Sequence, residues 1–246
     1  MDFQRARSDE QRAQRRRHIL EVTAGMLTEM PVAQLSLNEL SRRVGLAKAN
    51  VLRYFESREA ILLRLLDAEL RDWLTELEGA LTPVRGTPRE RGDRLARVLA
   101  ESLAERPVLC DLISAQAAVL ERNVSAQVAI EHKYATLRSF RALAELARRC
   151  LPELGPEDAF RLTGFTSLAA SAAWPYIQPS QALKAEYPDD PVVAAMHVDF
   201  AGVVRQILEV SISGLLGRQE DVPLGAGPLT AIPPDIGQEQ GEGGLP

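Results

Sequence analysis

Three side chains that lie close together in the sequence, Lys48, Asn50 and Arg53, are suited to binding nucleic acid. Lysine and arginine can bind phosphate oxygens or the O6 and N7 atoms of guanine, and an asparagine amide can pair with the edge of adenine. Between them, Ala49 and Leu52 offer apolar contact, for example with thymine methyl groups. These residue types at this spacing predict a short surface that reads duplex DNA.

Residues near this surface are suited to holding the DNA backbone. Ser36 and Arg58 are each expected at a helix N-terminus, where free backbone N–H groups help to bind a phosphate. Tyr54 can give its hydroxyl to a phosphate, and Asn38 either touches a base or faces solvent. The cluster 15–17 holds three arginines, which either reach a phosphate or the minor groove or begin a solvated helix. The predicted DNA-binding set is Ser36, Asn38, Lys48, Ala49, Asn50, Leu52, Arg53, Tyr54 and Arg58.

The elements that position these residues are predicted to be a helix, a tight turn and a second short helix over residues 36–55. Apolar residues fall at helical spacing on the inner faces of both helices: Leu37, Leu40, Val44, Leu46, Val51 and Phe55. Gly45 follows the first helix, at a place where glycine ends a helix in the left-handed conformation without strain. The pattern is typical of a helix-turn-helix motif, although two helices at the corner of a protein core would share this spacing.

The run from Ile19 to about Leu66 resembles the DNA-binding domain of the tetracycline-repressor (TetR) family of bacterial regulators. The residues that carry the resemblance are Ser36, Gly45, Tyr54-Phe55 and Ser57-Arg58-Glu59. The matching run covers about a fifth of the chain. Leu52, Ala47 and Arg58 stand where the family usually has a tyrosine, a serine and a lysine, so two hydroxyls of the usual contact set are missing.

The resemblance implies a homodimeric transcriptional regulator, and more specifically a repressor that a small-molecule effector releases from a near-palindromic operator in double-stranded DNA. A regulator without a ligand, an activator, and a helical interaction protein or enzyme with a similar first domain are the alternatives. The three histidines and two cysteines lack metal-binding spacing, and the chain has no phosphate-binding glycine loop or nucleophile elbow. We therefore expect no enzyme activity, no cofactor and no metal.

The composition favours helices, because 46% of the 246 residues are apolar and only 5% are aromatic. We expect an all-α fold, with an N-terminal three-helix helix-turn-helix domain and a larger C-terminal helical domain for ligand binding and dimerisation. Two cysteines and no basic-then-apolar leader indicate a cytoplasmic protein. The uncharged run 162–183 contains Pro175 and Pro179 and is too polar to span a membrane, so a buried helix is expected there.

Charge and proline positions divide the chain into parts. These are a flexible charged arm (1–10), a head (11–82) with its motif (36–55) and linking helix (57–81), a helical body (83–217) and a disordered Gly/Pro-rich tail (218–246).

Residues 1–60 hold eleven Arg and Lys against eight Asp and Glu, a charge of +3 that leaves −8 for the remainder. A positive end joined to a negative body is expected when one domain meets nucleic acid, and the few phosphate contacts that each subunit can make favour a dimer.

The last body helix carries two apolar seams at heptad spacing, one for the subunit's own core and one for a partner. We expect helices 157–176 and 190–216 to pair with their copies in a two-fold four-helix bundle. A wide apolar helix buried within one subunit is the alternative. The predicted interface is formed by Leu168, Ala172, Val193, Met196, Phe200, Val203, Ile207 and Val210.

A ligand pocket is expected between the body helices, because bundles form cavities there. The candidate lining residues are aromatic or carry a polar handle, and each is also compatible with a place in the core or on the surface. They are Cys110, Gln116, His132, Tyr134, Phe140, Phe165, Trp174 and Tyr176.

Overall fold

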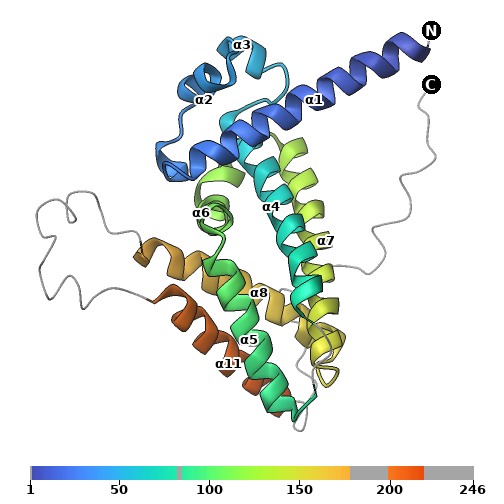
Figure 1. The fold of residues 1–246 in the computed structure, drawn as a ribbon, viewed down its shortest axis with the longest axis vertical. Helices are drawn as coiled ribbons and strands as arrows, with labels where there is room; N and C mark the ends of the chain where they lie inside the picture. The colour runs from blue at the N-terminus through green and yellow to red at the C-terminus, as the bar shows by residue number, and fades with distance from the viewer. Residues whose placement is uncertain (1, 82–84, 178–198, 219–246) are drawn as a thin grey trace, which may run out of the picture.

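The computed structural model describes residues 2–81, 85–177 and 199–218, with side chains from Glu10 onward, and every regular element within these ranges is helical (Figure 1). This confirms the predicted all-α fold. The elements, in chain order, are α1 (Asp2–Leu27), η1 (Val32–Gln34), α2 (Leu37–Val44), α3 (Lys48–Val51), α4 (Arg58–Ala80), α5 (Pro88–Ala104), α6 (Pro107–Ala115), the π-helical turn η2 (Gln116–Leu120), η3 (Glu121–Asn123), α7 (Ala126–Cys150), α8 (Pro156–Ala173), η4 (Trp174–Ile177) and α11 (Phe200–Arg218).

The head consists of α1, α2, α3 and the first turns of α4, which lie together at one end of the molecule (Figure 1). The hydroxyl of Ser36 accepts a hydrogen bond from the backbone N–H of Glu39 at 3.1 Å and so caps the start of α2. Gly45 ends α2 with φ 73° and ψ 28°, the left-handed conformation expected from the sequence. The helix-turn-helix is therefore held by one cap at each end of α2.

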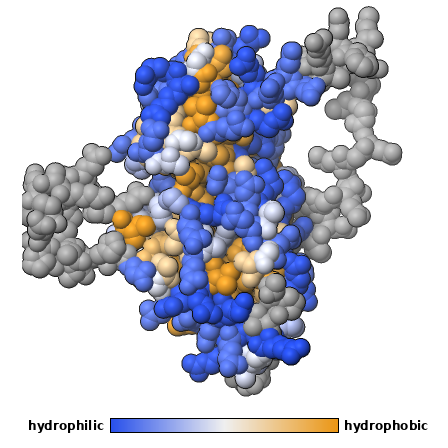
Figure 2. Space-filling model, viewed as in Figure 1, coloured by the Kyte–Doolittle hydropathy of each residue, from blue (hydrophilic) through white to orange (hydrophobic). Residues whose placement is uncertain are grey.

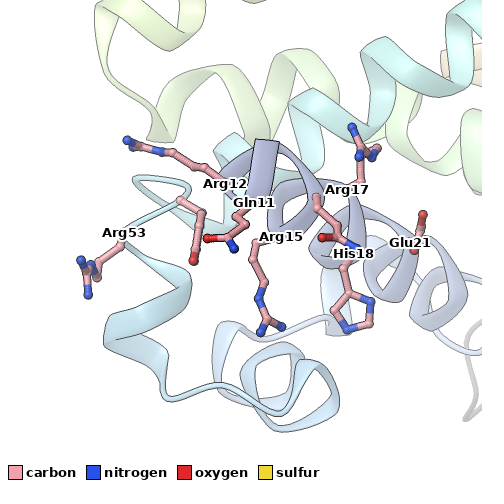
Figure 3. A pocket seen from close by; sticks show the side chains of 9 residues that line it. Gln11, Arg12, Arg15, Arg17, His18, Glu21 and Arg53 are labelled. Atoms are coloured by element: carbon pink, nitrogen blue, oxygen red, sulfur yellow. The ribbon is translucent and has the colours of Figure 1, made fainter. Parts of the chain in front are cut away.

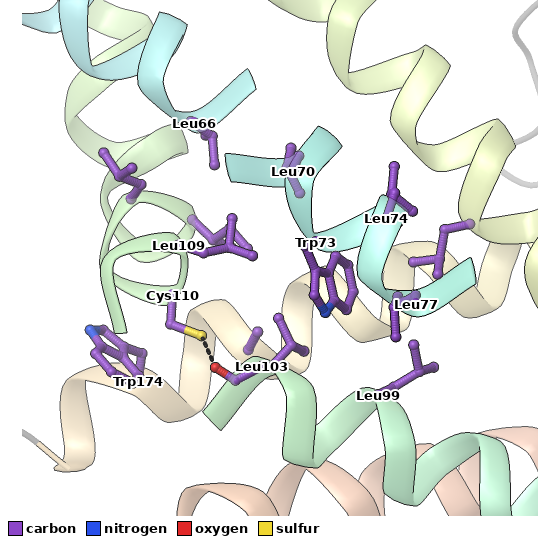
Figure 4. Close-up of a cluster of buried hydrophobic side chains, with 14 of the residues drawn as sticks. Leu66, Leu70, Trp73, Leu74, Leu77, Leu99, Leu103, Leu109, Cys110 and Trp174 are labelled. Carbon is purple, nitrogen blue, oxygen red and sulfur yellow. Dashed lines mark hydrogen bonds between the residues drawn. The ribbon is translucent and has the colours of Figure 1, made fainter. Parts of the chain in front are cut away.

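The long helix α4 connects the head to the body. It begins at the predicted place, because the Ser57 hydroxyl accepts a hydrogen bond from the N–H of Ala60 at 3.1 Å. Figure 1 shows α4 running from the head along α7. Its lower half forms the centre of the body core, where Trp73 and Leu77 meet Leu103 from α5 (Figure 4). A rod shared by both cores in this way makes the position of the head depend on the packing of the body.

The body is a stack of α5, α6, α7, α8 and α11 around the lower half of α4. Thr87 and Glu90 cap the start of α5 reciprocally, and α5 lies closely against α11. This closeness depends on Gly92, since a Cβ at that position would lie 2.8 Å from Cγ2 of Ile212. The two helices therefore form one packed layer, and α8 lies against α11 beside it.

The N-terminal segment differs from the expected flexible arm, because α1 begins at Asp2 and runs without a break to Leu27. Residues 2–10 lack an apolar stripe, but they include arginine, alanine and glutamine, which favour helices even on a solvated segment. The predicted interface residues Val193 and Met196 and the predicted tail after Arg218 lie outside the described residues.

Candidate nucleic-acid interface

The helix-turn-helix over residues 36–55, here called the recognition unit, presents its polar residues at the end of the molecule opposite α5 and α11 (Figure 1). Val51 is fully buried and Phe55 nearly so, which fixes the inner side of α3. Lys48 and Asn50 are exposed on its outer side, and Arg53 is exposed in the turn that follows α3. Three side chains that can bind phosphates and base edges thus share one surface that the body does not cover.

Apolar contact groups lie on the same surface. Ala49 is exposed, and Leu52 is 38% exposed although it is a large hydrophobic residue. An exposed leucine between polar residues fits contact with thymine methyl groups better than it fits solvent. Tyr54 is half-buried against the core of the head, so its ring packs inward as expected.

The charges of the recognition unit are available for an anion. Among the described residues neither Lys48 nor Arg53 forms an ion pair with a carboxylate. The arginines of α2 differ, because Arg42 pairs with Glu39 at 2.5 Å and Arg43 also pairs with acidic residues of the head. Lys48 and Arg53 therefore carry positive charge that no carboxylate among the described residues neutralises.

Three predicted DNA contacts come from other elements. Ser36 and Asn38 are exposed at the start of α2, where both side chains are accessible to the sugar-phosphate backbone of a bound DNA. Arg58 differs from the expectation, because its guanidinium donates to the carbonyl of Leu35 at 2.7 Å and pairs with Glu59 at 2.9 Å. In this structure Arg58 holds the head together instead of pointing to solvent, so we do not assign it a phosphate.

A wide polar groove separates α1 from the recognition unit (Figure 3). It has a volume of about 1230 Å³. Its lining residues are Gln11, Arg12, Gln14, Arg15, Arg17, His18, Glu21, Arg53 and Tyr54. The sequence predicted a possible backbone contact only for the cluster 15–17 and gave no sign that residues of α1 and Arg53 line one groove.

A second, much smaller cavity lies in the body between α4, α6, α7 and α8. Its free volume of about 20 Å³ is room for about one water. The lining is mainly apolar with a few hydroxyl and amide groups, and no lining residue is charged: Leu70, Trp73, Leu74, Leu103, Ile113, Gln116, Thr136, Ser139, Phe140, Leu143, Thr163, Thr166, Ser167 and Ala170. From the predicted pocket set, the structure brings Gln116 and Phe140 together here.

Four other residues predicted for the pocket do not line this cavity, and three of them lie near the surface or the edge of the core. Tyr134 is 39% exposed and Tyr176 is 74% exposed. Phe165 is half-buried at the edge of the core. Trp174 is buried and packs edge-on against Phe200, with ring centroids 5.4 Å apart. The residue type of an aromatic side chain gives no sign of which neighbour covers it, so the sequence could not place these four.

Cys110 was also predicted for the pocket and is a core residue instead. Its thiol is fully buried and donates a hydrogen bond to the carbonyl of Leu103 at 3.2 Å (Figure 4). Burial, together with the neighbouring carboxylate of Asp111, raises the pKa of the Cys110 thiol to about 12. Such a thiol is a structural group and is poorly suited to chemistry.

His132 lies beside the cavity wall and forms a buried pair that the sequence analysis did not foresee. Its Nδ1 is 2.7 Å from Oδ1 of Asp67 on α4, and both side chains are almost completely buried. On the other side of the ring, Nε2 is 3.4 Å from the hydroxyl of Thr136, which lines the cavity. A polar residue inside the apolar stripe of a helix, as Asp67 is beside Leu66, was the signal that could have revealed this pair.

Two hydrogen bonds connect the head directly to the body. The N–H of Val32 in η1 donates to Oδ2 of Asp111 on α6 at 2.6 Å. The N–H of Ser125, which caps α7, donates to Oε1 of Glu56 at 2.6 Å, and this bond and the Ser125 hydroxyl lower the pKa of Glu56. The head is thus attached to the body on both sides of α4.

The apolar seam predicted to meet a partner is on the surface. Leu168 on α8 is 64% exposed, and on α11 Ile207 is 41% and Val210 is 69% exposed. Val203 and Ala172 are exposed beside them. On the face drawn in Figure 2, hydrophobic residues reach the surface along the head and where α5, α8 and α11 meet. An apolar face of this kind fits contact with another protein surface.

The second seam of α11 is buried, as its spacing predicted: Val204, Leu208, Ile212 and Leu215. Phe200 was assigned to the exposed seam, but its ring is buried against Trp174 and so belongs to the core. By length and composition alone α11 could cross a membrane, the single helix in the described ranges to pass that test. Its buried seam against α5 and α8 fits a core helix of a helical body better.

Comparison with known proteins agrees with this arrangement. A model of bacterial regulatory proteins of the tetR family matches residues 19–65, and a model of the tetracyclin repressor-like C-terminal domain matches residues 67–219. No curated protein matches the chain.

Solved structures show the same fold at low sequence identity. The transcriptional regulator FadR from Bacillus subtilis, in complex with stearoyl-CoA, is 14% identical with a TM-score of 0.51, over 80% of this chain and 97% of that chain. A TetR transcriptional regulator from Rhodococcus sp. RHA1 is also 14% identical with a TM-score of 0.51, over 84% of this chain and 99% of that chain.

Proposed function

This chain belongs to the TetR family of bacterial regulatory proteins, and we propose that it is a homodimeric repressor that binds a near-palindromic DNA operator. As a family member it is a DNA-binding transcriptional regulator. The observation that carries the finer proposal is the exposure of Lys48, Asn50 and Arg53, on α3 and in the turn after it. The inner side of α3 is buried, and neither Lys48 nor Arg53 has a carboxylate partner among the described residues. Two such heads related by two-fold symmetry would enter successive major grooves of one duplex.

The dimer would form through the exposed seam of α8 and α11. Leu168, Ile207 and Val210 expose apolar surface that water solvates poorly, and packing against a second copy would cover it. A two-fold axis beside α8 and α11 makes a bundle of four helices, since each subunit contributes both. The two heads would then be held at a fixed separation by the two α4 rods.

A small molecule in the body cavity would release the DNA. Its lining carries no charged side chain, so we propose an uncharged, mainly apolar effector, with Gln116 and Thr136 as its polar contacts. The FadR regulator holds stearoyl-CoA, whose phosphates would find no cation in this lining. Because the free volume is only about 20 Å³, the effector must widen the cavity, which moves α4 and thus the head. A nearly complete switch requires a preference of about 5.5 kcal/mol for the widened state.

The DNA-binding proposal is tested with alanine variants of Lys48, Asn50 and Arg53, using fluorescence anisotropy on a duplex recovered by selection from random sequences. Asn50→Ala is expected to cost about 1–3 kcal/mol on the selected duplex and to relax the preference at one base pair of each half-site. Lys48→Ala and Arg53→Ala are expected to weaken binding and its salt dependence. Arg97→Ala on α5 is the matched control. Unchanged binding in all three variants would exclude α3 as the reading surface.

A further inference from the structure

We infer that the groove between α1 and the recognition unit holds the DNA sugar-phosphate backbone beside the bases that α3 reads. This inference rests on the proposed DNA-binding function and adds a second contact surface to it. The groove is lined by Arg12, Arg15 and Arg17 from α1 and by Arg53 from the recognition unit. Each head would then grip DNA with two elements, α3 in the major groove and α1 along the neighbouring backbone.

The shape of the groove suits a polymer strand. It is open and has a volume of about 1230 Å³, far larger than the cavity in the body. Figure 3 shows Arg15 and His18 projecting from α1 toward the ribbon of α2 and α3. Figure 1 shows that the N-terminal half of α1 extends past the head at the end of the molecule that carries α2 and α3. A duplex placed against α3 would therefore meet α1 as well.

The charge of the groove suits a polyanion. Arg12, Arg15 and Arg17 are exposed, and none of them forms an ion pair with a residue whose side chain the structure describes. Glu21, at one end, is the only carboxylate of the lining. An apolar ligand would find no surface here, whereas a row of phosphates would release counterions from several arginines at once.

The continuity of the groove with the reading surface selects duplex DNA among polyanions. Arg53 and Tyr54 line the groove, and both lie at the end of the recognition unit that presents Lys48 and Asn50. A strand in the groove is therefore one whose neighbouring bases face α3. The same contacts with a free nucleotide or single-stranded RNA would leave α3 without a partner.

The helix α1 is fixed in place relative to α3. The guanidinium of Arg16 lies over the ring of Phe55, with the carbon centre 4.6 Å from the ring centroid. Further along the helix, Ile19 and Met26 anchor α1 in the core of the head. Burial lowers the pKa of Arg16, and so does repulsion from Arg64 and Arg12, which shows how closely the cations gather here. The arginines are thus arranged before DNA arrives, which reduces the entropy cost of binding.

The test compares the parent with the triple variant Arg12→Gln/Arg15→Gln/Arg17→Gln on the selected duplex, with anisotropy measured over a series of salt concentrations. Glutamine keeps the helix propensity of arginine, and circular dichroism checks the helix content. The slope of log K against log salt should become shallower by about 0.9 for each lost phosphate, so by about 2 or more for two heads. The ratio of specific to non-specific affinity should stay within about twofold, because backbone contacts carry no sequence information.

The control Arg89→Gln/Arg94→Gln/Arg97→Gln makes the same charge change on exposed residues of α5, far from the head. A slope equal to the parent's in the groove variant, or an equal loss in the control, would overturn the inference. The inference would also be overturned if the groove variant lost affinity for single-stranded RNA while its affinity for the duplex stayed unchanged. If the parent binds no duplex, the proposed function itself fails. If Arg53→Ala weakens binding and the triple variant does not, only the groove is excluded.

Discussion

Among single residues, Gly45 has the greatest influence on the shape of the reading surface. Its φ of 73° lies in the left-handed region, and an added Cβ would meet nothing within 4 Å. The requirement for glycine is therefore conformational and not steric. Because this one residue sets the direction in which the chain leaves α2, it determines where Lys48 and Asn50 point.

Gly45→Ala should lower the free energy of unfolding by about 1–2 kcal/mol, the cost of a left-handed backbone for a residue with a Cβ. Urea denaturation followed by circular dichroism measures it. Gly25→Ala is the control, since Gly25 lies in α1 with ordinary φ and open space around it. That change should raise stability by about 0.5–1 kcal/mol. Equal changes in the free energy of unfolding for the two variants would show that a side chain at position 45 does not strain the backbone.

The thiol of Cys110 should not react with an aromatic disulfide reagent in the native protein. With a pKa of about 12, only about one thiol in ten thousand is ionised at pH 8, and the residue is fully buried. The change in absorbance with time, with and without denaturant, measures the reaction. Cys150 is also buried with a raised pKa, so both thiols should react only after unfolding. Rapid reaction of one thiol in native conditions would contradict the packing of the body core.

Single residues also show where sequence reasoning stops. The exposure of Lys48, Asn50 and Arg53 was predicted from the spacing of their apolar neighbours, and all three side chains are exposed in the structure. The hydrogen bond from Arg58 to the carbonyl of Leu35 could not be predicted, because the two residues are 23 positions apart and meet only through tertiary packing. Most of the lining of the body cavity was missed for the same reason, since it depends on how α4, α6, α7 and α8 cross.

The helices themselves were predictable where they have an apolar face. The caps at Ser36 and Ser57 and the glycine after α2 fix the ends of α2 and α4 from local chemistry alone. A helix over residues 2–10 was not predicted, because these residues have no apolar stripe and so lack the periodicity that signals a helix, although α1 runs through them. Helix propensity and continuity with a buried helix decided that segment instead.

Asp111 on α6 should couple the head to the body. Its carboxylate accepts the N–H of Val32, so Asp111→Ala leaves a half-buried donor without its partner. The expected loss is about 1–3 kcal/mol, and calorimetry should show the head melting before the body. Asp72→Ala, at an exposed position of α4, is the control and should change stability by less than about 0.5 kcal/mol. A single unchanged transition in Asp111→Ala would show that α4 alone joins the two parts.

The whole molecule combines a basic N-terminal end with an acidic remainder, and the two proposed binding surfaces lie on different elements. Residues 1–60 carry a charge of +3 and the remainder −8, so DNA is attracted only to the head. The exposed seam lies on α8 and α11, away from α3 (Figure 1). The proposed dimer interface and the proposed DNA-reading surface are therefore separate, and α4 connects the parts that carry them.

Ile207→Glu should convert the protein to monomers, because it places a charge in the proposed apolar interface. Operator affinity should then fall by about tenfold or more, since the two heads no longer bind as one unit. Sedimentation equilibrium measures the mass and anisotropy the affinity. Ile130→Glu is the matched control, at a residue of α7 that is 47% exposed against 41% for Ile207. Dimers of undiminished stability in Ile207→Glu would place the interface elsewhere.

Selection of bound sequences from random duplex DNA tests the central proposal most directly. We expect enrichment of two half-sites related by two-fold symmetry, with centres about one helical turn or a multiple apart. The Asn50→Ala variant should enrich the same arrangement with one base pair relaxed in each half-site. Recovery of no preferred sequence, or of a single site without symmetry that Asn50→Ala leaves unchanged, would contradict the proposal that α3 of a dimer reads the operator.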